Sequence, residues 1–263
     1  MLTQGQIQAA SDLLYRHWQE DRRLAALPEA LRPATRAEGY AIQALLEARS
    51  QAPLFGWKIA ATSRDGQAHL KVDGPLAGRL LAERVHDSGA VLAFGRNHMR
   101  VAEPEFAFRI GRALAPRATP FGRDEVLDAV ESPHPAIEVP DSRFEDFTSV
   151  GAAQLIADNA CARSLVLGWA APASWRALDL AGHVVVGSVA GKLRREGSGA
   201  NVLGDPRIAL TWLANELSGL GLGLGAGQMV TTGTCLKPLP LAPADQVLAD
   251  FGVLGTVAAR FGL

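Results

Sequence analysis

The sequence VAEPEFAF, residues 101–108, is predicted to form a β-strand with two different faces. Alternate side chains of a strand point to the same side, so Glu103 and Glu105 share one face while the proline and the two phenylalanines share the other. The apolar face belongs in a core, which makes the strand at least half-buried. Two carboxylates about 7 Å apart along a strand repel each other, and burying an unpaired anion is unfavourable. We therefore expect a cation or basic side chains beside Glu103 and Glu105.

A third acidic residue lies further along, in PAIEVPDSR, residues 135–143. Glu138 is a single charge between Ile137 and Val139, and in a strand it points away from both. Three carboxylates with no histidine or thiolate form a hard oxygen ligand set, which favours Mg²⁺ or Mn²⁺, permits Ca²⁺ and disfavours Zn²⁺. Spacing alone leaves another interpretation open, in which the acidic residues lie on exposed strand faces paired with arginines. Periodicity does not bring Glu138 to the other two.

A lysine surrounded by small residues is the second candidate feature. In FGWKIAATS, residues 55–63, Lys58 shares a strand face with glycine, alanine and Thr62, opposite the aromatic and aliphatic side chains. Such neighbours leave room for a ligand, so Lys58 is a candidate to bind a carboxylate or to move a proton. The alternative is a surface lysine whose stem lies along apolar neighbours.

A hydroxyl-rich strand end is the third candidate feature. In MVTTGTC, residues 229–235, a strand runs into Thr231, Thr232, Gly233 and Thr234. Backbone N–H groups and hydroxyls of such a segment can donate hydrogen bonds to an anionic substrate. Many strand ends have this composition, so the segment alone is a weak signal.

The composition is that of a globular protein and not of a disordered chain, with 263 residues, 48% hydrophobic and 20% charged, and a net charge of −1. The sequence lacks the basic stripe that is typical of a protein with a nucleic-acid partner. The densest basic cluster, Lys192, Arg194 and Arg195, is expected in a solvated turn.

Location and redox state are also constrained by composition. The two cysteines lack Cys-x-x-Cys spacing, which argues against a disulfide framework or a zinc site and fits a reduced, cytoplasmic location. The first ten residues lack an apolar signal core. The most apolar stretch, residues 165–173, is about half the length that a bilayer requires. We therefore expect no membrane span.

The chain is expected to divide near residue 52 into an N-terminal helical segment, residues 1–52, and a catalytic β-rich domain, residues 53–263. Pairs with capping-box spacing, Thr3 with Gln6 and Thr35 with Glu38, begin the two expected helices. Their core faces are predicted to carry Ile7, Leu13, Leu14 and Trp18 in the first helix and Tyr40, Ala44, Leu45 and Ala48 in the second.

Short apolar stretches alternate with glycine- and proline-rich turns in the second part. The predicted strands are residues 55–61, 102–110, 136–139, 165–169, 183–189, 228–232, 246–251 and 256–261. Helices are expected at 124–130, 149–160 and 206–217, the last with Asp205 as N-cap. Strands outnumber helices without strict alternation, which indicates an α+β fold and not a doubly wound sheet. The glycine ladder at 219–227 lies between a helix and a strand, the reverse of a dinucleotide-binding fingerprint.

These segments, in this order, resemble the 2-keto-4-pentenoate hydratase and 4-oxalocrotonate decarboxylase family, within the fumarylacetoacetate hydrolase superfamily, over nearly the whole chain. The resemblance implies a β-rich mixed-sheet roll of the fumarylacetoacetate hydrolase C-terminal type, preceded by a helical segment. It implies metal ligation by Glu103, Glu105 and Glu138. It implies catalytic roles for Lys58 and for Asp73, which lies in VDGP, residues 72–75. The residues implied to bind substrate are Thr62, Thr231, Thr232, Gly233 and Thr234.

The activity implied by the resemblance is addition of water to a 2-hydroxy-2,4-dienoate of the 2-keto-4-pentenoate type, giving a 4-hydroxy-2-oxo acid in the catabolism of aromatic ring-cleavage products. Mg²⁺ or Mn²⁺ would bind the substrate carboxylate and C2 oxygen, while Lys58 and Asp73 divide proton transfer, carboxylate binding and water orientation between them. The resemblance also implies a homo-oligomer, with association with a neighbouring pathway enzyme as a further option. Two departures, Ala60 in place of a glycine and a less glycine-rich segment at 232–238, leave the exact substrate open.

Three other functions stay open at this point. One is decarboxylation of a 2-oxo-enedioate such as 4-oxalocrotonate. Another is C–C hydrolysis of an acylpyruvate, which needs a strong base such as a His–Glu pair, for which His98 and His134 are the candidates. The third is a non-catalytic partner subunit of such an enzyme, and the complete set of Lys58 with three glutamates argues against it.

Overall fold

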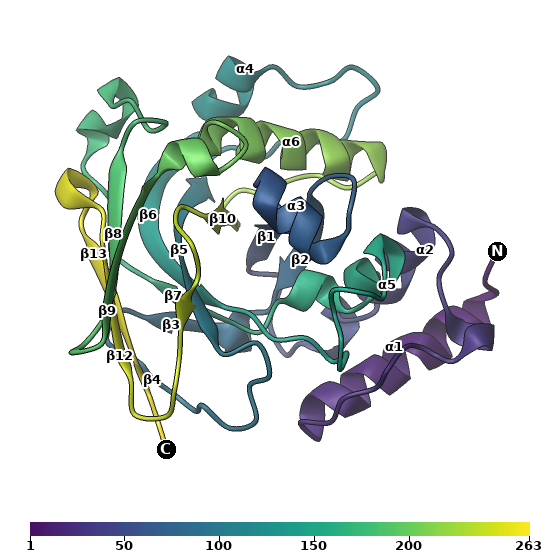
Figure 1. The fold of residues 1–263 in the computed structure, drawn as a ribbon. Helices are drawn as coiled ribbons and strands as arrows, with labels where there is room; N and C mark the ends of the chain where they lie inside the picture. The colour runs from purple at the N-terminus through teal and green to yellow at the C-terminus, as the bar shows by residue number, and fades with distance from the viewer.

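Two β-sheets form the centre of the computed structural model, which describes residues 1–263 (Figure 1). The eight-stranded sheet has the order β2 (Leu76–Leu80), β1 (Gly56–Ala60), β10 (Met229–Thr234), β5 (Val101–Ile110), β6 (Val130–Val139), β7 (Ser164–Leu167) and β3 (Val85–Asp87), with β11 (Leu239–Pro240) also paired to β5. The five-stranded sheet has the order β4 (Val91–Leu92), β13 (Thr256–Phe261), β12 (Gln246–Asp250), β8 (Val184–Val189) and β9 (Leu193–Ser198). Pairing is parallel between β1 and β10 and antiparallel between β10, β5 and β6. The predicted α+β fold with mixed sheets is therefore confirmed.

Six α-helices surround the sheets. They are α1 (Gln4–Gln19), α2 (Arg36–Ala44), α3 (Arg64–Leu70), α4 (Arg123–Asp128), α5 (Ala152–Ala157) and α6 (Pro206–Gly219), and none is long and apolar enough to cross a membrane. Both predicted capping boxes are present, because the Thr3 and Thr35 side chains each accept a hydrogen bond from the backbone three residues on. Asp205 caps α6 as predicted, accepting from the Arg207 N–H.

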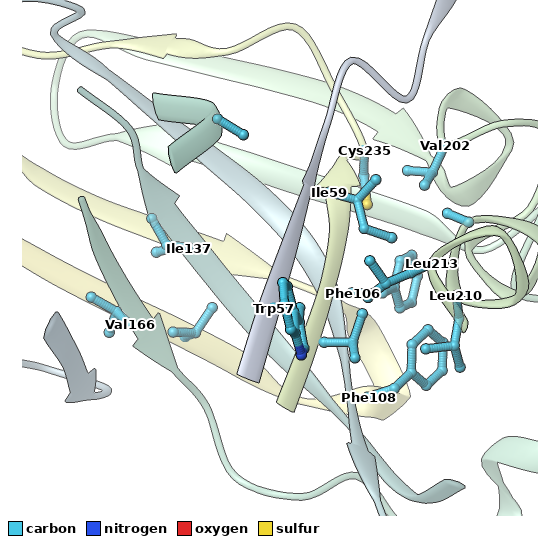
Figure 2. Packing of buried hydrophobic residues seen from close by; sticks show 14 of the residues in the cluster. Trp57, Ile59, Phe106, Phe108, Ile137, Val166, Val202, Leu210, Leu213 and Cys235 are labelled. Carbon is cyan, nitrogen blue, oxygen red and sulfur yellow. The ribbon is translucent and has the colours of Figure 1, made fainter. Parts of the chain in front are cut away.

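The main core lies between the eight-stranded sheet and α6. Ile59 of β1 and Phe106 and Phe108 of β5 are fully buried, and Figure 2 shows them directed toward Leu210 and Leu213 of α6. The alternation predicted for residues 101–108 is thus confirmed on its apolar side. Because strand side chains alternate, the opposite face of β1 and β5 carries Lys58, Glu103 and Glu105.

The N-terminal helices pack beside α5, on the side of the molecule away from the five-stranded sheet (Figure 1). A separate small apolar cluster joins them to the rest of the chain and consists of Ala10, Leu14, Leu27, Ile42, Phe144 and Ala157. The helical segment therefore shares a core with residues after 140. The division at residue 52 stays a prediction about organisation.

The predicted face of the second helix is partly wrong. Tyr40 is buried, but Ala44 and Ala48 are exposed, and the buried positions are instead Ile42 and Leu46. Within α2 the buried face includes Gly39, Ile42 and Gln43, which leaves Ala44 exposed, and because α2 ends at Ala44 the helical period does not continue to residue 48.

Strand β6 is longer than predicted, since it begins at Val130 and includes two prolines. The carbonyls of Pro133 and Pro135 accept from the N–H groups of Ala171 and Gly168. The side of the strand that lacks N–H donors therefore faces this loop and not β5, which is a position where a strand tolerates proline.

Three further expectations at the level of elements need correction. Arg194 and Arg195 lie in β9 and not in a turn, because residues 193–198 pair with β8. The helix expected to reach residue 160 ends at Ala157, and Asn159 begins a tight turn. The short elements α3 and β2 were not predicted. They have 7 and 5 residues respectively, which is too few for a clear periodic signal.

Candidate metal and substrate site

Cross-strand register brings the three glutamates together. Glu103 of β5 pairs directly with Glu138 of β6, and Glu105 lies two residues along the same face of β5. One carboxylate oxygen from each residue lies within 4.8 Å of one from each of the other two. Spacing along the chain could not show this, because the register of two strands depends on long-range pairing.

Lys58 enters the same cluster from β1. It pairs in register with Thr231 of β10, which in turn pairs with Ala107 of β5, so these three residues share the face of the glutamates. The Lys58 Nζ lies 3.0 Å from Glu138 Oε1, and the two side chains are 3% and 1% exposed. The same nitrogen donates a hydrogen bond to the Ala160 carbonyl at 3.0 Å. The lysine is therefore buried and not a surface lysine.

The pKa directions follow from burial and from the excess of negative charge. Burial raises the pKa of Glu103 to about 7, and the nearby Glu138 charge adds to the shift. Burial likewise raises the pKa of Glu105 and of Glu138. Burial alone would lower the pKa of Lys58, but the charges of Glu138, Glu103 and Glu105 raise it overall. The lysine is therefore an ammonium at neutral pH, beside carboxylates that hold protons more tightly than usual.

The cluster has the chemistry of a divalent cation site. Glu105 Oε1 and Glu138 Oε2 are buried without a hydrogen-bond partner, and no arginine forms an ion pair with any of the three glutamates. The alternative of exposed, arginine-paired strand faces is thus wrong. When all three carboxylates are ionised, they and the one ammonium leave two negative charges, and a hard divalent cation fits both that charge and the orphaned oxygens.

The hydroxyl-rich segment contributes to the site in an unexpected way. The Gly233 N–H donates to Glu105 Oε2 at 2.9 Å and so positions a carboxylate. A Cβ on Gly233, whose φ is +99°, would lie 1.9 Å from Thr62 Oγ1, so only glycine fits there. Thr232 Oγ1 donates to the Phe106 carbonyl and Thr234 Oγ1 to the Leu236 carbonyl.

Thr231 differs from its neighbours in this segment. Its side chain is fully buried, and its hydroxyl has no hydrogen-bond partner. It lies on the face of Lys58 and the glutamates, so its hydroxyl is free for a ligand, unlike those of Thr232 and Thr234. Thr62 is buried as well, and its carbonyl accepts from the Leu203 N–H.

Asp73 and the two candidate histidines are not brought into the cluster. The Asp73 side chain is 88% exposed and lies 3.5 Å from Arg36. His98 Nε2 is hydrogen-bonded to the Glu145 carbonyl, and His134 to Ser132 and the Gly168 carbonyl. Neither histidine forms a hydrogen bond with a glutamate side chain, so the His–Glu base expected for C–C hydrolysis is not formed by them.

The turn that carries the Ala160 carbonyl contacts Lys58, and its left-handed conformation was not predicted from the sequence, which indicated a helix there. The signal was present in Asp158-Asn159 at a helix end, since asparagine tolerates the left-handed conformation that ends many helices.

Residues 83–261 match the fumarylacetoacetate (FAA) hydrolase C-terminal family, so the chain belongs to this family, as its sequence indicated. A relative over nearly the full length is 2-keto-4-pentenoate hydratase of Paraburkholderia xenovorans (strain LB400), 30% identical over 263 residues, which are 99% of this chain and 96% of the relative. 4-Oxalocrotonate decarboxylase of Pseudomonas sp. (strain CF600) is 32% identical over 231 residues, 86% of each chain. The solved structure of 4-oxalocrotonate decarboxylase from Pseudomonas putida G7, complexed with magnesium and adipate, has a TM-score of 0.90 at 27% identity and covers 99% of both chains.

Proposed function

We propose that the protein is a hydro-lyase that depends on a divalent metal and adds water to a 2-hydroxy-2,4-dienoate to give a 4-hydroxy-2-oxo acid. The observation that carries the proposal is the cluster of buried Glu105, Glu138 and Lys58 with half-buried Glu103, in which two carboxylate oxygens lack partners. Near full-length similarity to a 2-keto-4-pentenoate hydratase supports the same choice of substrate class.

The three glutamates would hold Mg²⁺ or Mn²⁺, which when bound supplies a fixed positive charge for the substrate carboxylate and C2 oxygen. Lys58 orients the substrate through the one N–H that its ammonium has left after Ala160 and Glu138. Thr231 donates or accepts a hydrogen bond through its free hydroxyl.

The reaction has two steps, and each moves protons. The dienol loses its C2 hydroxyl proton and gains a proton at C5, which gives the 3,4-unsaturated 2-oxo acid. Water then adds its oxygen to C4 and a proton to C3, since conjugation with the ketone makes C4 electrophilic. Lys58 lies within the buried cluster and is the candidate to move one of these protons.

The role of Asp73 in proton shuttling or water orientation stays a prediction, and it requires the loop around residues 72–75 to move toward the site. The Asp73→Asn variant tests it through the pH dependence of kcat. An unchanged profile with unchanged kcat would remove Asp73 from the mechanism.

The direct test is turnover of freshly generated 2-hydroxypenta-2,4-dienoate, followed by its ultraviolet absorbance with Mg²⁺, with Mn²⁺ and with a chelator. We expect metal-dependent loss of the diene and formation of 4-hydroxy-2-oxopentanoate. A protein that binds Mg²⁺ but leaves the diene unchanged would rule the hydratase proposal out.

Decarboxylation of 4-oxalocrotonate is the second candidate, favoured by the close superposition on a decarboxylase structure. The two reactions are separated by their products, since only decarboxylation releases carbon dioxide. Assays of the separately purified protein also test whether it acts alone or only as a partner subunit.

We further propose a cytoplasmic homo-oligomer that acts on a small 2-oxo or enol acid. Light scattering of the purified protein tests the oligomer, and a monomer at micromolar concentration would contradict it.

A further inference from the structure

Three consecutive residues other than glycine adopt left-handed backbone conformations next to the candidate site. The φ angles of Asn159, Ala160 and Cys161 are 56°, 49° and 62°. The left-handed conformation is sterically unfavourable for a residue with a Cβ atom, and such strain persists where surrounding contacts enforce it. The carbonyl at the centre of this turn, that of Ala160, accepts the hydrogen bond from Lys58 Nζ.

The Asn159 side chain fastens the turn to strand β2. Its Oδ1 accepts from the Arg79 N–H at 2.6 Å, and its Nδ2 donates to the Arg79 carbonyl at 2.9 Å. β2 is an edge strand, so this amide takes the place of a neighbouring strand at that residue. Gly78 permits the approach, because a Cβ there would lie 2.5 Å from the Asn159 carbonyl oxygen.

A buried ion pair fastens the start of the turn. The Asp158 carboxylate accepts from Ser142 Oγ at 2.7 Å and from the Arg143 N–H at 3.0 Å, and it forms an ion pair with the Arg143 side chain. The Arg143 guanidinium lies over the ring of Trp18 of α1, 5.0 Å from its centroid. The N-terminal helix therefore contributes to the same anchoring.

Every backbone carbonyl of the turn accepts a hydrogen bond. The Asn159 carbonyl accepts from the Ala162 N–H, the Cys161 carbonyl from the Asp141 N–H, and the Ala160 carbonyl from Lys58. Without the turn, Lys58 would have Glu138 as its one fixed partner, and the direction of its remaining N–H groups would be undetermined.

We propose that the left-handed turn 159–161 is a positioning element for Lys58, and that Asn159 is the positioning residue that holds it. The proposal rests on the proposed function in that Lys58 is taken to act on the substrate. The strained backbone then holds one neutral acceptor, the Ala160 carbonyl, at a fixed point beside the buried Lys58 ammonium.

Asn159→Gly removes the two hydrogen bonds to Arg79 and leaves the left-handed backbone accessible. We expect kcat to fall at least tenfold, while KM and the Kd for Mg²⁺, measured by calorimetry, change less than threefold. Asn159→Asp, which keeps the acceptor for the Arg79 N–H, should recover part of kcat.

The matched control is Asn215→Ala. Asn215 of α6 makes the same two-bond clamp to one backbone residue, accepting from the Phe121 N–H at 2.7 Å and donating to its carbonyl at 3.1 Å. The control should lose a similar amount of Tm and keep kcat. An equal loss of kcat in both variants, or a loss of Mg²⁺ affinity in Asn159→Gly, would overturn the proposal.

Crystal structures separate this proposal from the proposed function. If the wild-type protein turns over neither the dienoate nor 4-oxalocrotonate, the function fails, and the positioning claim is then decided by the Lys58 Nζ to Ala160 O distance. We expect it to exceed 3.5 Å in Asn159→Gly. A variant that retains 3.0 Å would show that Asn159 does not position the lysine.

Discussion

Two charged clusters in the interior of this protein differ in whether their carboxylate oxygens have partners within the chain. In the closed cluster, Asp158 and Arg143, both carboxylate oxygens accept hydrogen bonds and the guanidinium also donates to backbone carbonyls. In the open cluster, Glu103, Glu105, Glu138 and Lys58, two carboxylate oxygens have no partner.

The difference separates architecture from function. A buried charge that is fully paired within the chain needs nothing more, and its removal damages the fold. A buried set with excess charge of one sign is unfavourable in the isolated chain and becomes favourable when a ligand of opposite charge binds. Changes in the open cluster are therefore expected to act mainly on activity. Changes in the closed cluster are expected to act mainly on stability, and on activity only through the turn 159–161 that it anchors.

The largest expected effect breaks the open cluster. Glu105→Gln keeps the shape of the side chain and removes a charge, so we expect turnover to fall on the order of 10³-fold or more and Mg²⁺ binding to weaken strongly. The Tm of the metal-free variant should equal or exceed that of the wild type, because an unsatisfied buried anion is gone. A lower metal-free Tm with intact Mg²⁺ binding would show that the comparison is wrong.

The matching change in the closed cluster is Asp158→Ala. It leaves Arg143 buried without its carboxylate, and we expect the free energy of unfolding to fall by roughly 3–5 kcal/mol. Urea unfolding with and without Mg²⁺ measures this. A loss below about 1 kcal/mol, the range of an exposed ion pair, would mean that the closed cluster does not stabilise the fold.

The pH dependence of stability sharpens the contrast. In the metal-free protein the pKa of Glu103 is raised to about 7 from its ordinary 4.5. The folded state then holds the proton more tightly than the unfolded state, so this group lowers stability as pH rises from about 4.5 to about 7. We expect the metal-free Tm to fall across that window and saturating Mg²⁺ to reduce the fall. A metal-free Tm that rises between pH 5 and pH 7 would contradict the assignment.

The smallest expected effect concerns the Thr231 hydroxyl, which has no hydrogen-bond partner and lies on the same face as the open cluster. Thr231→Val replaces an unpartnered buried hydroxyl with a methyl group of similar size, so the Tm should change little. If the hydroxyl contacts substrate, kcat/KM should fall about tenfold, the effect of 1.4 kcal/mol. The control is Thr232→Val, because the Thr232 hydroxyl donates to the Phe106 carbonyl. Steady-state kinetics of both variants would separate the two threonines. Equal activity of Thr231→Val and wild type would exclude a contact between the Thr231 hydroxyl and the substrate.

Local patterns were sufficient for much of the fold. The alternation around Glu103 and Glu105 correctly gave the two faces of β5, and capping boxes correctly located the starts of α1 and α2, because both signals depend on neighbours along the chain. The start of β6 was predicted too late in the chain, at a proline-rich stretch. Whether a strand tolerates proline depends on which of its sides meets another strand.

The sequence named Glu103, Glu105, Glu138 and Lys58 as candidates, but it predicted neither how they meet nor that Asp73 lies outside their cluster. The meeting of Glu138 with Glu103 depends on the β5–β6 register, and the burial of Lys58 depends on strands far apart in sequence. The left-handed turn at Asn159 is determined by tertiary contacts with Arg79 and Arg143, which no local pattern encodes.

The parallel pairing of β1 with β10 has a consequence for the order in which the chain can fold. Gly56 pairs with Met229, so during synthesis the strand that carries Lys58 leaves the ribosome long before its partner exists. Until β10 is made, β1 and β5 each expose an unpaired edge, which is a template for association with other chains. Closing so long a loop is slow. The nascent protein therefore depends on β10, residues 229–234, both to complete the active site and to cover the edges of the two strands that build it.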